Sequence, residues 1–387
     1  DNPTISIYDT ITGKKRKLLQ FPDQLGSREF VSIAFSHDGK HFVAQGGYPD
    51  YNLVYWHLEG KPKVLAVITS TTPDKEQVYQ CSIHPKDNTQ ICVSGNGVFK
   101  FFKYQDGGLK ISSAGMKKRD PLNYLYHTWL SDDRVIVACE SGEIILLENG
   151  EFKAVIQEST SQGLSLNCVI PYRKGFIVGG NDGVVMMFDK ADDKDSFRKK
   201  ILKINSSKGI SSDSAESSSS QSQVASNNIK SFALSTNEDV LAITTSSKQI
   251  YTLNLAQPDM VMKPEDVKFD LLSQSFHSSK IMGLDTCVRK PLVATCSKDR
   301  TVRIWNYVDN TLEISKTFTV DCHSVTLHPS GLHLIVGFQN KLSFMNLLGR
   351  DIREYKSFQV RNCPECRFSN GGQYFAAVHG NVINIYS

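Results

Sequence analysis

The chain has 387 residues, of which 40% are hydrophobic and 22% charged, as expected for a globular protein of one large or two smaller domains. Its formal net charge of +4 is too small and too dispersed to indicate a nucleic-acid-binding protein. No apolar run reaches the roughly 18 residues of a membrane-spanning helix, and no signal peptide is visible, so we expect neither nucleic acid nor a membrane as partner.

The first residues predict two short strands, at 5–9 and 15–19, which we interpret as the third and fourth strands of a unit whose first two strands lie upstream. Four more strands are expected at 31–35, 42–45, 53–56 and 64–68, with Gly, Asp, Asn and Pro between them. Each strand alternates or is wholly apolar, which is typical of short antiparallel strands.

The same pattern begins again further along the chain, with first strands near Val78, Leu125, Leu166, Ile229, Ile281, His323 and Glu365. Successive first strands lie about 41 to 52 residues apart, with one gap of about 63, and a period near 40 to 45 residues is typical of the four-stranded blade of a β-propeller. No stretch of three turns carries apolar residues at helical spacing. We therefore predict an all-β chain with eight first strands and a leading half blade.

The long gap contains residues 205–228, a serine-rich stretch that lacks the apolar residues needed to order itself. We predict a flexible insertion between blades. A tract of phosphate-accepting serines is the functional alternative.

Residues 277–318 are the clearest copy of the repeat, with two apolar strands, a tight turn and a third strand that ends in Trp305-Asn306. This copy resembles one WD40 repeat. In WD40 repeats a His, a Ser or Thr, an Asp and a Trp form a hydrogen-bonded chain, because a buried carboxylate is unfavourable unless donors surround it. The resemblance assigns these places, as a structural blade network without a catalytic role, to His277, Thr295, Asp299 and Trp305.

Propellers avoid open sheet edges by closing into rings, and a single ring of seven or eight blades is one arrangement for this chain. We favour two WD40 β-propellers in tandem. Residues 1–275 would then be most of a first, seven-bladed ring, with 205–228 as its insertion, and residues 276–387 the first blades of a second.

Catalytic signatures are scarce: the sequence has no G-x-x-x-x-G-K-[ST], H-E-x-x-H or G-x-S-x-G pattern. Cys363 and Cys366 form the one C-x-x-C pair, without the second ligand pair that a metal site needs. The nine cysteines are scattered through apolar runs, which fits buried, reduced thiols of an intracellular protein. We predict no catalytic, cofactor-binding or metal-binding residues, and no cofactor.

Two basic runs and one turn are candidates for partner binding. Dense positive charge can meet an acidic surface such as the tails of tubulin. Such runs are also common as solvated strand edges, where lysine deters edge pairing, and this alternative stays open. The candidate residues are Lys14, Lys15, Arg16 and Lys17 in the first run, Lys117, Lys118 and Arg119 in the second, and Tyr48 and Tyr51 in the turn.

Beyond the generic repeat, residues 87–100, 289–297, 305–313, 345–348 and 368–372 together resemble the WD-repeat region of the cilia- and flagella-associated protein 57 family. The resemblance implies a non-enzymatic scaffold of the ciliary axoneme, made in the cytoplasm and assembled on doublet microtubules, that helps anchor inner dynein arms and regulate beating. The implied partners are inner dynein arm subunits and other axonemal proteins, with tubulin as a further candidate, in a large multiprotein assembly.

Other functions are open to a propeller, because the fold alone does not determine function. The main alternative is a general cytosolic WD40 adaptor, such as a ubiquitin-ligase substrate receptor or a trafficking scaffold. A propeller enzyme is a third class, and it is disfavoured because the predicted inner strands are apolar and small rather than rich in carboxylates and histidines.

Overall fold

The computed structural model describes the chain except for residues 1–2, 23–24, 114–115, 117–120, 131–132, 159–164, 192–195, 205–226, 256–266, 268, 273–275 and 350. Its described residues form strands, turns and loops, with one turn of 3-10 helix, η1 (Asn181–Gly183). None of the helices found among them could cross a membrane. The predicted serine-rich insertion at 205–228 lies almost wholly outside the described residues.

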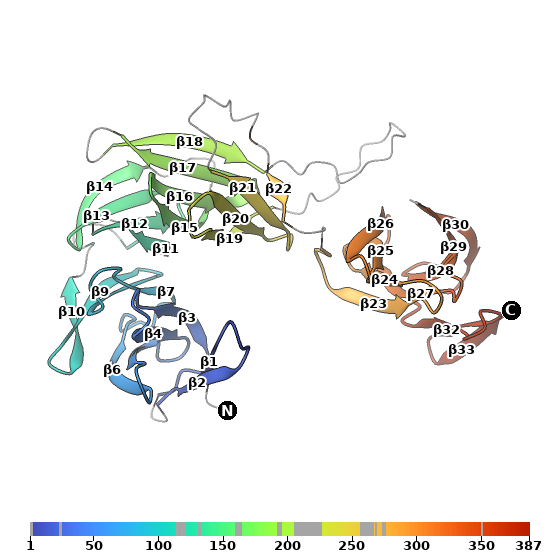
Figure 1. Cartoon of the computed structure of the whole chain (residues 1–387), viewed down its shortest axis with the longest axis horizontal. Helices are drawn as coiled ribbons and strands as arrows, with labels where there is room; N and C mark the ends of the chain where they lie inside the picture. Colours follow the sequence, from blue (N-terminus) through green and yellow to red (C-terminus); the bar gives the residue numbers. More distant parts are fainter. Residues whose placement is uncertain are drawn as a thin grey trace. The chain divides into compact units, whose positions relative to one another are not determined.

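The strands form a series of antiparallel sheets in which consecutive strands are neighbours (Figure 1). The first sheets are β1 (Thr4–Tyr8) with β2 (Lys15–Gln20); β3 (Phe30–Phe35), β4 (His41–Gly46), β5 (Asn52–His57) and β6 (Lys63–Thr69); β7 (Val78–Ile83), β8 (Gln90–Gly95), β9 (Val98–Gln105) and β10 (Gly108–Ser113); β11 (Tyr124–Trp129), β12 (Arg134–Cys139), β13 (Ile144–Glu148) and β14 (Glu151–Gln157); and β15 (Leu166–Tyr172), β16 (Gly175–Gly180), β17 (Val184–Lys190) and β18 (Phe197–Lys203).

The remaining sheets follow the same order. They are β19 (Ile229–Leu234), β20 (Val240–Thr245), β21 (Ile250–Asn254) and β22 (Asp270–Leu271); β23 (Ile281–Thr286), β24 (Leu292–Ser297), β25 (Thr301–Asn306) and β26 (Thr311–Thr317); β27 (Cys322–Leu327), β28 (His333–Phe338), β29 (Leu342–Leu348) and β30 (Asp351–Phe358); and β31 (Cys366–Phe368), β32 (Phe375–His379) and β33 (Val382–Tyr386).

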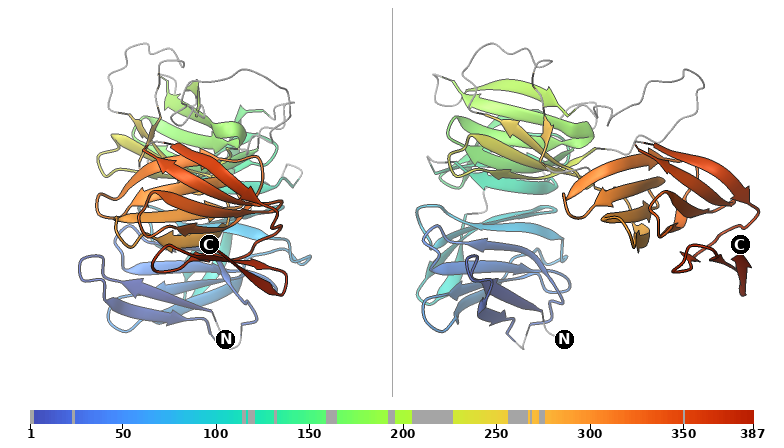
Figure 2. Two further views of the ribbon diagram at one scale, coloured as in Figure 1. Left: turned by 90° about the vertical axis from the view of Figure 1, so that its right-hand side faces the viewer. Right: turned by 45° about the vertical axis from the view of Figure 1, so that its right-hand side comes forward.

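The chain divides into two compact units: Asp1–Thr245 with Thr252–Phe269, and Ser246–Tyr251 with Asp270–Ser387. Within the first unit, the first strands of successive sheets touch in chain order, β3 with β7, β7 with β11, β11 with β15, and β15 with β19. Figure 2 shows the sheets from two further sides. Within the second unit, β23 touches β27 and β27 touches β31. Neighbouring sheets therefore meet along their first strands, as the blades of a propeller do.

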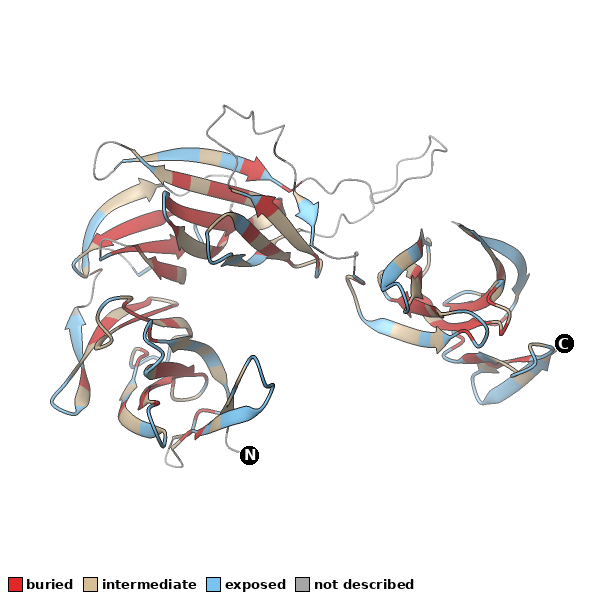
Figure 3. Cartoon of the chain, viewed as in Figure 1, coloured by how far each residue is buried: buried red, intermediate tan, exposed pale blue. Residues whose placement is uncertain are grey.

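The apolar cores lie between neighbouring sheets. One core joins Val43 and Tyr55 of one sheet to Ile91 and Phe102 of the next. Because a sheet is covered on both faces, its second strand is an uninterrupted buried run, as in β12, where every residue is buried. The fourth strand is mostly exposed, as in β30 (Figure 3).

The repeat is also visible in the register of the strands. In seven sheets the first strand pairs with the second, skips one residue and then resumes pairing. Such a β-bulge adds twist to the strand. Its recurrence at one position shows that the sheets are copies of a single unit, although their sequences differ.

The predicted architecture is confirmed as far as the structure describes it. The chain is all-β, and the predicted first strands are confirmed at Val78, Leu166, Ile229 and Ile281, with the others beginning one residue away, at Phe30, Tyr124, Cys322 and Cys366. The number of blades in each ring stays a prediction.

Candidate functional site

The four residues assigned to a blade network lie together in the second unit. The indole N–H of Trp305 donates to Thr295 Oγ1 at 2.9 Å, and Thr295 Oγ1 lies 2.7 Å from His277 Nε2. His277 Nδ1 lies 3.0 Å from Asp299 Oδ2. Since the carboxylate accepts from Nδ1–H, Nε2 accepts the threonine proton, and a directed chain runs from the indole to the carboxylate.

The carboxylate of Asp299 is buried and surrounded by donors. Its Oδ2 accepts the backbone N–H of Ser278 at 2.9 Å, and its Oδ1 accepts both the N–H and the hydroxyl of Thr301, at 2.9 and 2.6 Å. Burial alone would raise the pKa of Asp299, but the hydrogen bonds from His277 and Thr301 hold it well below its usual range. The network fastens the β24–β25 turn to the residues that enter β23, which is a structural task.

A second network of the same kind lies in the first unit, and the sequence analysis missed it. The indole N–H of Trp129 donates to Ser82 Oγ at 2.9 Å, and Ser82 Oγ lies 2.6 Å from His127 Nε2. His127 Nδ1 lies 2.8 Å from Ser94 Oγ, so a serine takes the place that Asp299 has in the other network. Burial lowers the pKa of His127 to about 3, so the ring is neutral.

The residues of the first basic run differ in their side-chain contacts. Arg16 forms an ion pair with Asp9 at 2.6 Å, and Lys17 donates to the carbonyl oxygens of Leu58 and Gly60. The Thr12 backbone N–H and the Arg16 guanidinium lower the pKa of Asp9 to about 2. Among the four predicted residues, Lys14 and Lys15 are exposed without a side-chain partner in the described chain.

The other candidates for partner binding do not join this run. Tyr48 is 63% exposed, but Tyr51 is only 7% exposed, because its ring packs into the core between β3–β6 and β7–β10. Of the two tyrosines that the sequence analysis named as candidates for partner binding, Tyr48 is therefore exposed, whereas Tyr51 is too buried to meet a partner. The second run, Lys117, Lys118 and Arg119, lies outside the described residues.

The candidates also fall on opposite ends of the sheets. In an antiparallel meander, the turns that join strands one to two and three to four lie at one end, which we call the odd-turn face, and the other connections lie at the opposite end. Lys14 and Lys15 belong to the odd-turn face, whereas Tyr48 lies between strands two and three, at the opposite end. They therefore do not form one continuous surface.

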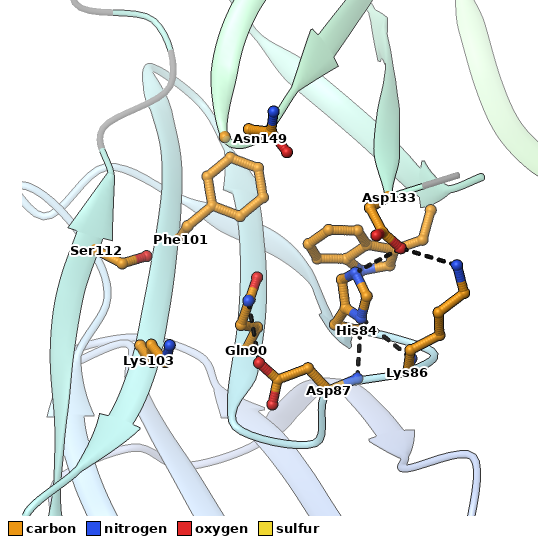
Figure 4. A pocket seen from close by; sticks show the side chains of 11 residues that line it. His84, Lys86, Asp87, Gln90, Phe101, Lys103, Ser112, Asp133 and Asn149 are labelled. Atoms are coloured by element: carbon orange, nitrogen blue, oxygen red, sulfur yellow. Dashed lines mark hydrogen bonds and ion pairs between the residues drawn. The ribbon is translucent and has the colours of Figure 1, made fainter. Parts of the chain in front are cut away.

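The odd-turn face of the first unit holds a pocket between sheets β7–β10 and β11–β14 (Figure 4). On one side His84, the ring of Trp129 and Asp133 gather. His84 Nδ1 accepts the backbone N–H groups of Lys86 and Asp87 at 3.1 and 3.0 Å, which places the ring proton on Nε2, 3.4 Å from Asp133 Oδ1.

This histidine orders its turn rather than moving protons. Burial lowers the pKa of His84, and Nδ1, the atom that could act as a base, is occupied by two backbone donors. The opposite side of the pocket carries the polar side chains of Lys103, Ser112 and Asn149. In the part of the chain that the structure describes, no three His, Cys, Asp or Glu side chains are arranged to hold a metal ion.

Known proteins resemble this chain in sequence and in repeat type. A family model described as "WD domain, G-beta repeat" matches residues 270–306, which overlap the clearest predicted repeat. One solved structure, the C-terminal WD40 domain of Sif2, is 14% identical with a TM-score of 0.40 over 92% of this chain and 94% of that one, a likeness too weak to carry an argument.

Among curated proteins, cilia- and flagella-associated protein 57 of Mus musculus is 37% identical over 100% of this chain and 34% of its own length. Cilia- and flagella-associated protein 57 A of Tetrahymena thermophila is 34% identical over 93% of this chain and 28% of its own length. The 77 kDa echinoderm microtubule-associated protein of Strongylocentrotus purpuratus is 23% identical over 100% of this chain and 51% of its own length. The chain thus spans about a third of the first two relatives. The chain thus carries a WD repeat and is similar, along nearly its whole length, to proteins named cilia- and flagella-associated protein 57.

Proposed function

We propose that the protein is a non-enzymatic scaffold of the ciliary axoneme that helps anchor or regulate inner dynein arms on doublet microtubules. The observation that carries this proposal is the similarity, along the whole chain, to proteins named as associated with cilia and flagella. A more distant relative is named as a microtubule-associated protein, which supports the expectation of a microtubule-bound assembly.

The state of the buried titratable groups supports a scaffold. His277, His127 and His84 are each held by hydrogen bonds on both ring nitrogens or by backbone donors, and Asp299 is enclosed by donors. Side chains engaged in this way stabilise sheets and turns. Partner binding then falls to the exposed turns, where propellers present most of their variable side chains.

We also propose that the two compact units belong to two propellers in tandem, with 1–275 in the first ring and 276–387 in the second. Support comes from the repeated four-stranded sheets and from the division of the chain near residue 270. Proteolysis between the units that leaves two stable fragments is the expected result, and a single protected core would contradict the tandem arrangement.

The axonemal proposal is tested by the location of the protein that contains this chain, tagged and expressed in ciliated cells. We expect it to remain on doublet microtubules after extraction with detergent and to resist moderate salt. We also expect inner dynein arm subunits to be depleted from the axonemes of cells that lack it, and to return on rescue. A soluble cytosolic distribution in ciliated cells would favour the general WD40 adaptor instead.

A further inference from the structure

Two histidines of the first unit meet at its odd-turn face. His41 begins β4 and His57 ends β5, and the two residues are direct cross-strand partners. His41 Nε2 lies 3.3 Å from His57 Nδ1. The sequence analysis predicted no metal ligands, because these histidines are 16 residues apart along the chain and become neighbours only through the register of the two strands.

The contact between the two rings is poor as a hydrogen bond. An N–H hydrogen bond usually joins heavy atoms about 2.9 to 3.0 Å apart, so a separation of 3.3 Å is long. The ring centroids are 5.0 Å apart, closer than those of two rings joined by a straight hydrogen bond of that length. Two nitrogens bound to one tetrahedral zinc ion, each at about 2.0 to 2.1 Å, are about 3.3 to 3.4 Å apart. The pair therefore has the spacing of two ligands of one metal ion.

The carboxylates around the pair favour a bound cation. Glu59 Oε2 lies 3.7 Å from His57 Nε2, the ring nitrogen that does not face His41. A carboxylate in this position favours the proton on Nε2 and leaves the lone pair of Nδ1 for a metal ion. Asp38 and Glu59 also favour positive charge at His41, and they offset the repulsion from Lys40.

The two nitrogens that face each other are available to an ion. Burial and the neighbouring His57 lower the pKa of His41, so its ring is neutral at pH 7 and has a lone pair to donate. Its Nδ1 is buried without a partner in the described chain, so Nε2 is the nitrogen that can bind. The His57 side chain is 34% exposed, which leaves access for the ion and for water. The described residues supply no cluster of three ligands, so water completes the coordination.

The second unit has the same register position without the pair. His333 begins β28 and pairs with Asn346, and its Nδ1 lies 2.8 Å from Asn346 Oδ1. Its neighbour His328 contacts the Ser330 hydroxyl through Nδ1 and the carbonyl oxygen of Gly372 through Nε2. These nitrogens are engaged by the protein itself, so His333 provides an internal control.

We propose that His41 Nε2 and His57 Nδ1 bind one zinc(II) ion, with water in the remaining positions, and that the ion links β4 to β5 at the odd-turn face. Imidazole nitrogen is a preferred ligand of zinc and copper, whereas calcium and magnesium prefer oxygen. The site is independent of the basic runs, and it does not rest on the proposed axonemal role.

The test is isothermal titration calorimetry of zinc chloride with the 387-residue chain, after treatment with a chelator and with the thiols kept reduced. All nine cysteines are buried, which limits their competition for zinc. We expect His41→Gln and His57→Gln each to weaken binding by at least about tenfold, because loss of an outer-shell partner alone typically costs that much. The matched control is His333→Gln, which should leave the affinity unchanged.

Copper(II) gives a second measurement, which reports the ligands rather than the affinity. With one equivalent of copper(II), the electron paramagnetic resonance spectrum of the parent chain should show coupling to two ring nitrogens. His57→Gln should show coupling to fewer. This substitution changes a side chain near the surface, and urea unfolding of the variant checks that it folds.

Each outcome decides the proposal. Weaker zinc binding in the His41 and His57 variants alone, with coupling to two nitrogens in the parent, supports it. Unchanged affinity in both variants would overturn the site. Equal losses in these variants and in His333→Gln would show general binding to histidines, and coupling to a single nitrogen in the parent would show that the two rings do not share an ion. Either result would also overturn it.

Discussion

His127 Nε2 lies 2.6 Å from Ser82 Oγ, so a side chain on the first strand of one sheet completes the hydrogen bonding of the preceding sheet. The other ring nitrogen is engaged by Ser94 at 2.8 Å, and the residue is only 1% exposed. Serine hydroxyls can accept as well as donate, so both partners fit either form of the ring, and it is burial, which lowers the pKa of His127, that disfavours the charged imidazolium here. The junction between these sheets therefore depends on an uncharged ring.

This dependence predicts acid sensitivity. The pKa of His127 is about 3 in the folded chain, against about 6.5 for an ordinary histidine, so between these values the unfolded chain binds a proton that the folded chain does not. The contribution of the neutral His127 to the free energy of unfolding is therefore fully present above about pH 6.5. Below that pH it falls by up to about 1.4 kcal/mol per pH unit. Urea unfolding of the chain at several pH values between 7 and 4.5 measures this slope.

The matched variant is His127→Gln, which we expect to be less stable at pH 7 and to have a shallower slope. His41 and His84, whose pKa values burial also lowers, remain in the variant and account for the residual slope. An unchanged slope would assign the acid sensitivity to those histidines.

The network around Asp299 gives a second prediction. Asp299→Asn keeps the size of the side chain but removes the charge that His277 and Thr301 donate to, and we expect a loss of about 2 to 3 kcal/mol in unfolding free energy. Because its folded pKa is lowered, this contribution is present above about pH 4 and is lost below it. Asp309→Asn, in the exposed turn that follows β25, is the control, with an expected change below about 0.5 kcal/mol. Hydrogen exchange in β24 and β25 locates the effect, and equal losses in the two variants would contradict it.

The two networks show which sites the sequence could predict. His277, Thr295, Asp299 and Trp305 lie in one repeat at the spacing of a WD40 blade, so their pattern can be read along the chain. His127 bonds to serines 45 and 33 residues earlier, in the preceding sheet. Serine residues form no distinctive sequence pattern. In addition, Trp129 lies on the first strand of its sheet, whereas the WD40 pattern places the Trp on the third strand, so a search for that pattern misses this network.

Loop positions were harder to predict than strands. Strand positions follow from apolar periodicity, which sets which faces are buried. Tyr51 stands in a turn between polar residues, and only the packing of its ring against the neighbouring sheet reveals that it is buried. The pocket beside Trp129 likewise joins turns of two sheets, which no local pattern brings together.

Close approach of neighbouring sheets gives a third prediction, at Gly337 in β28. A Cβ there would lie 2.3 Å from Ser324 Oγ and 2.8 Å from the backbone carbonyl oxygen of Cys363. We expect Gly337→Ala to destabilise the second unit by about 2 to 3 kcal/mol, because the carbonyl cannot move without displacing the chain before β31. Gly371→Ala, where the added carbon would meet nothing within 4 Å, should be nearly neutral. Thermal unfolding of both variants tests this, and similar melting temperatures would contradict the close packing.

If the first basic run contributes to axonemal attachment, Lys14 and Lys15 are its residues that are exposed without a side-chain partner in the described chain. We expect Lys14→Glu with Lys15→Glu to reduce retention on detergent-extracted axonemes at low salt, because charge reversal repels an acidic partner. Lys61→Glu with Lys63→Glu, on another turn of the same face, is the control for a general charge effect. Equal retention of both variants and the parent would show that Lys14 and Lys15 do not bind an axonemal partner and are part of a solvated strand edge.

The carboxylate of Asp285 links three sheets of the second unit. Its Oδ2 accepts the Thr326 hydroxyl at 2.6 Å and the Leu327 backbone N–H at 2.8 Å, while Oδ1 pairs with Arg367 at 3.1 Å. Asp285→Ala should destabilise the second unit by about 1 to 3 kcal/mol, because it leaves the hydroxyl and the N–H without an acceptor. Arg367→Ala should change stability by less than about 1 kcal/mol, because that side chain is 59% exposed and its ion pair is screened by water. A double-mutant cycle measured by urea unfolding separates the contribution of the Asp285–Arg367 ion pair from that of the hydrogen bonds to Thr326 and Leu327. A coupling energy as large as the whole effect of Asp285→Ala would show that the ion pair, and not the hydrogen bonds to β27, holds the sheets together.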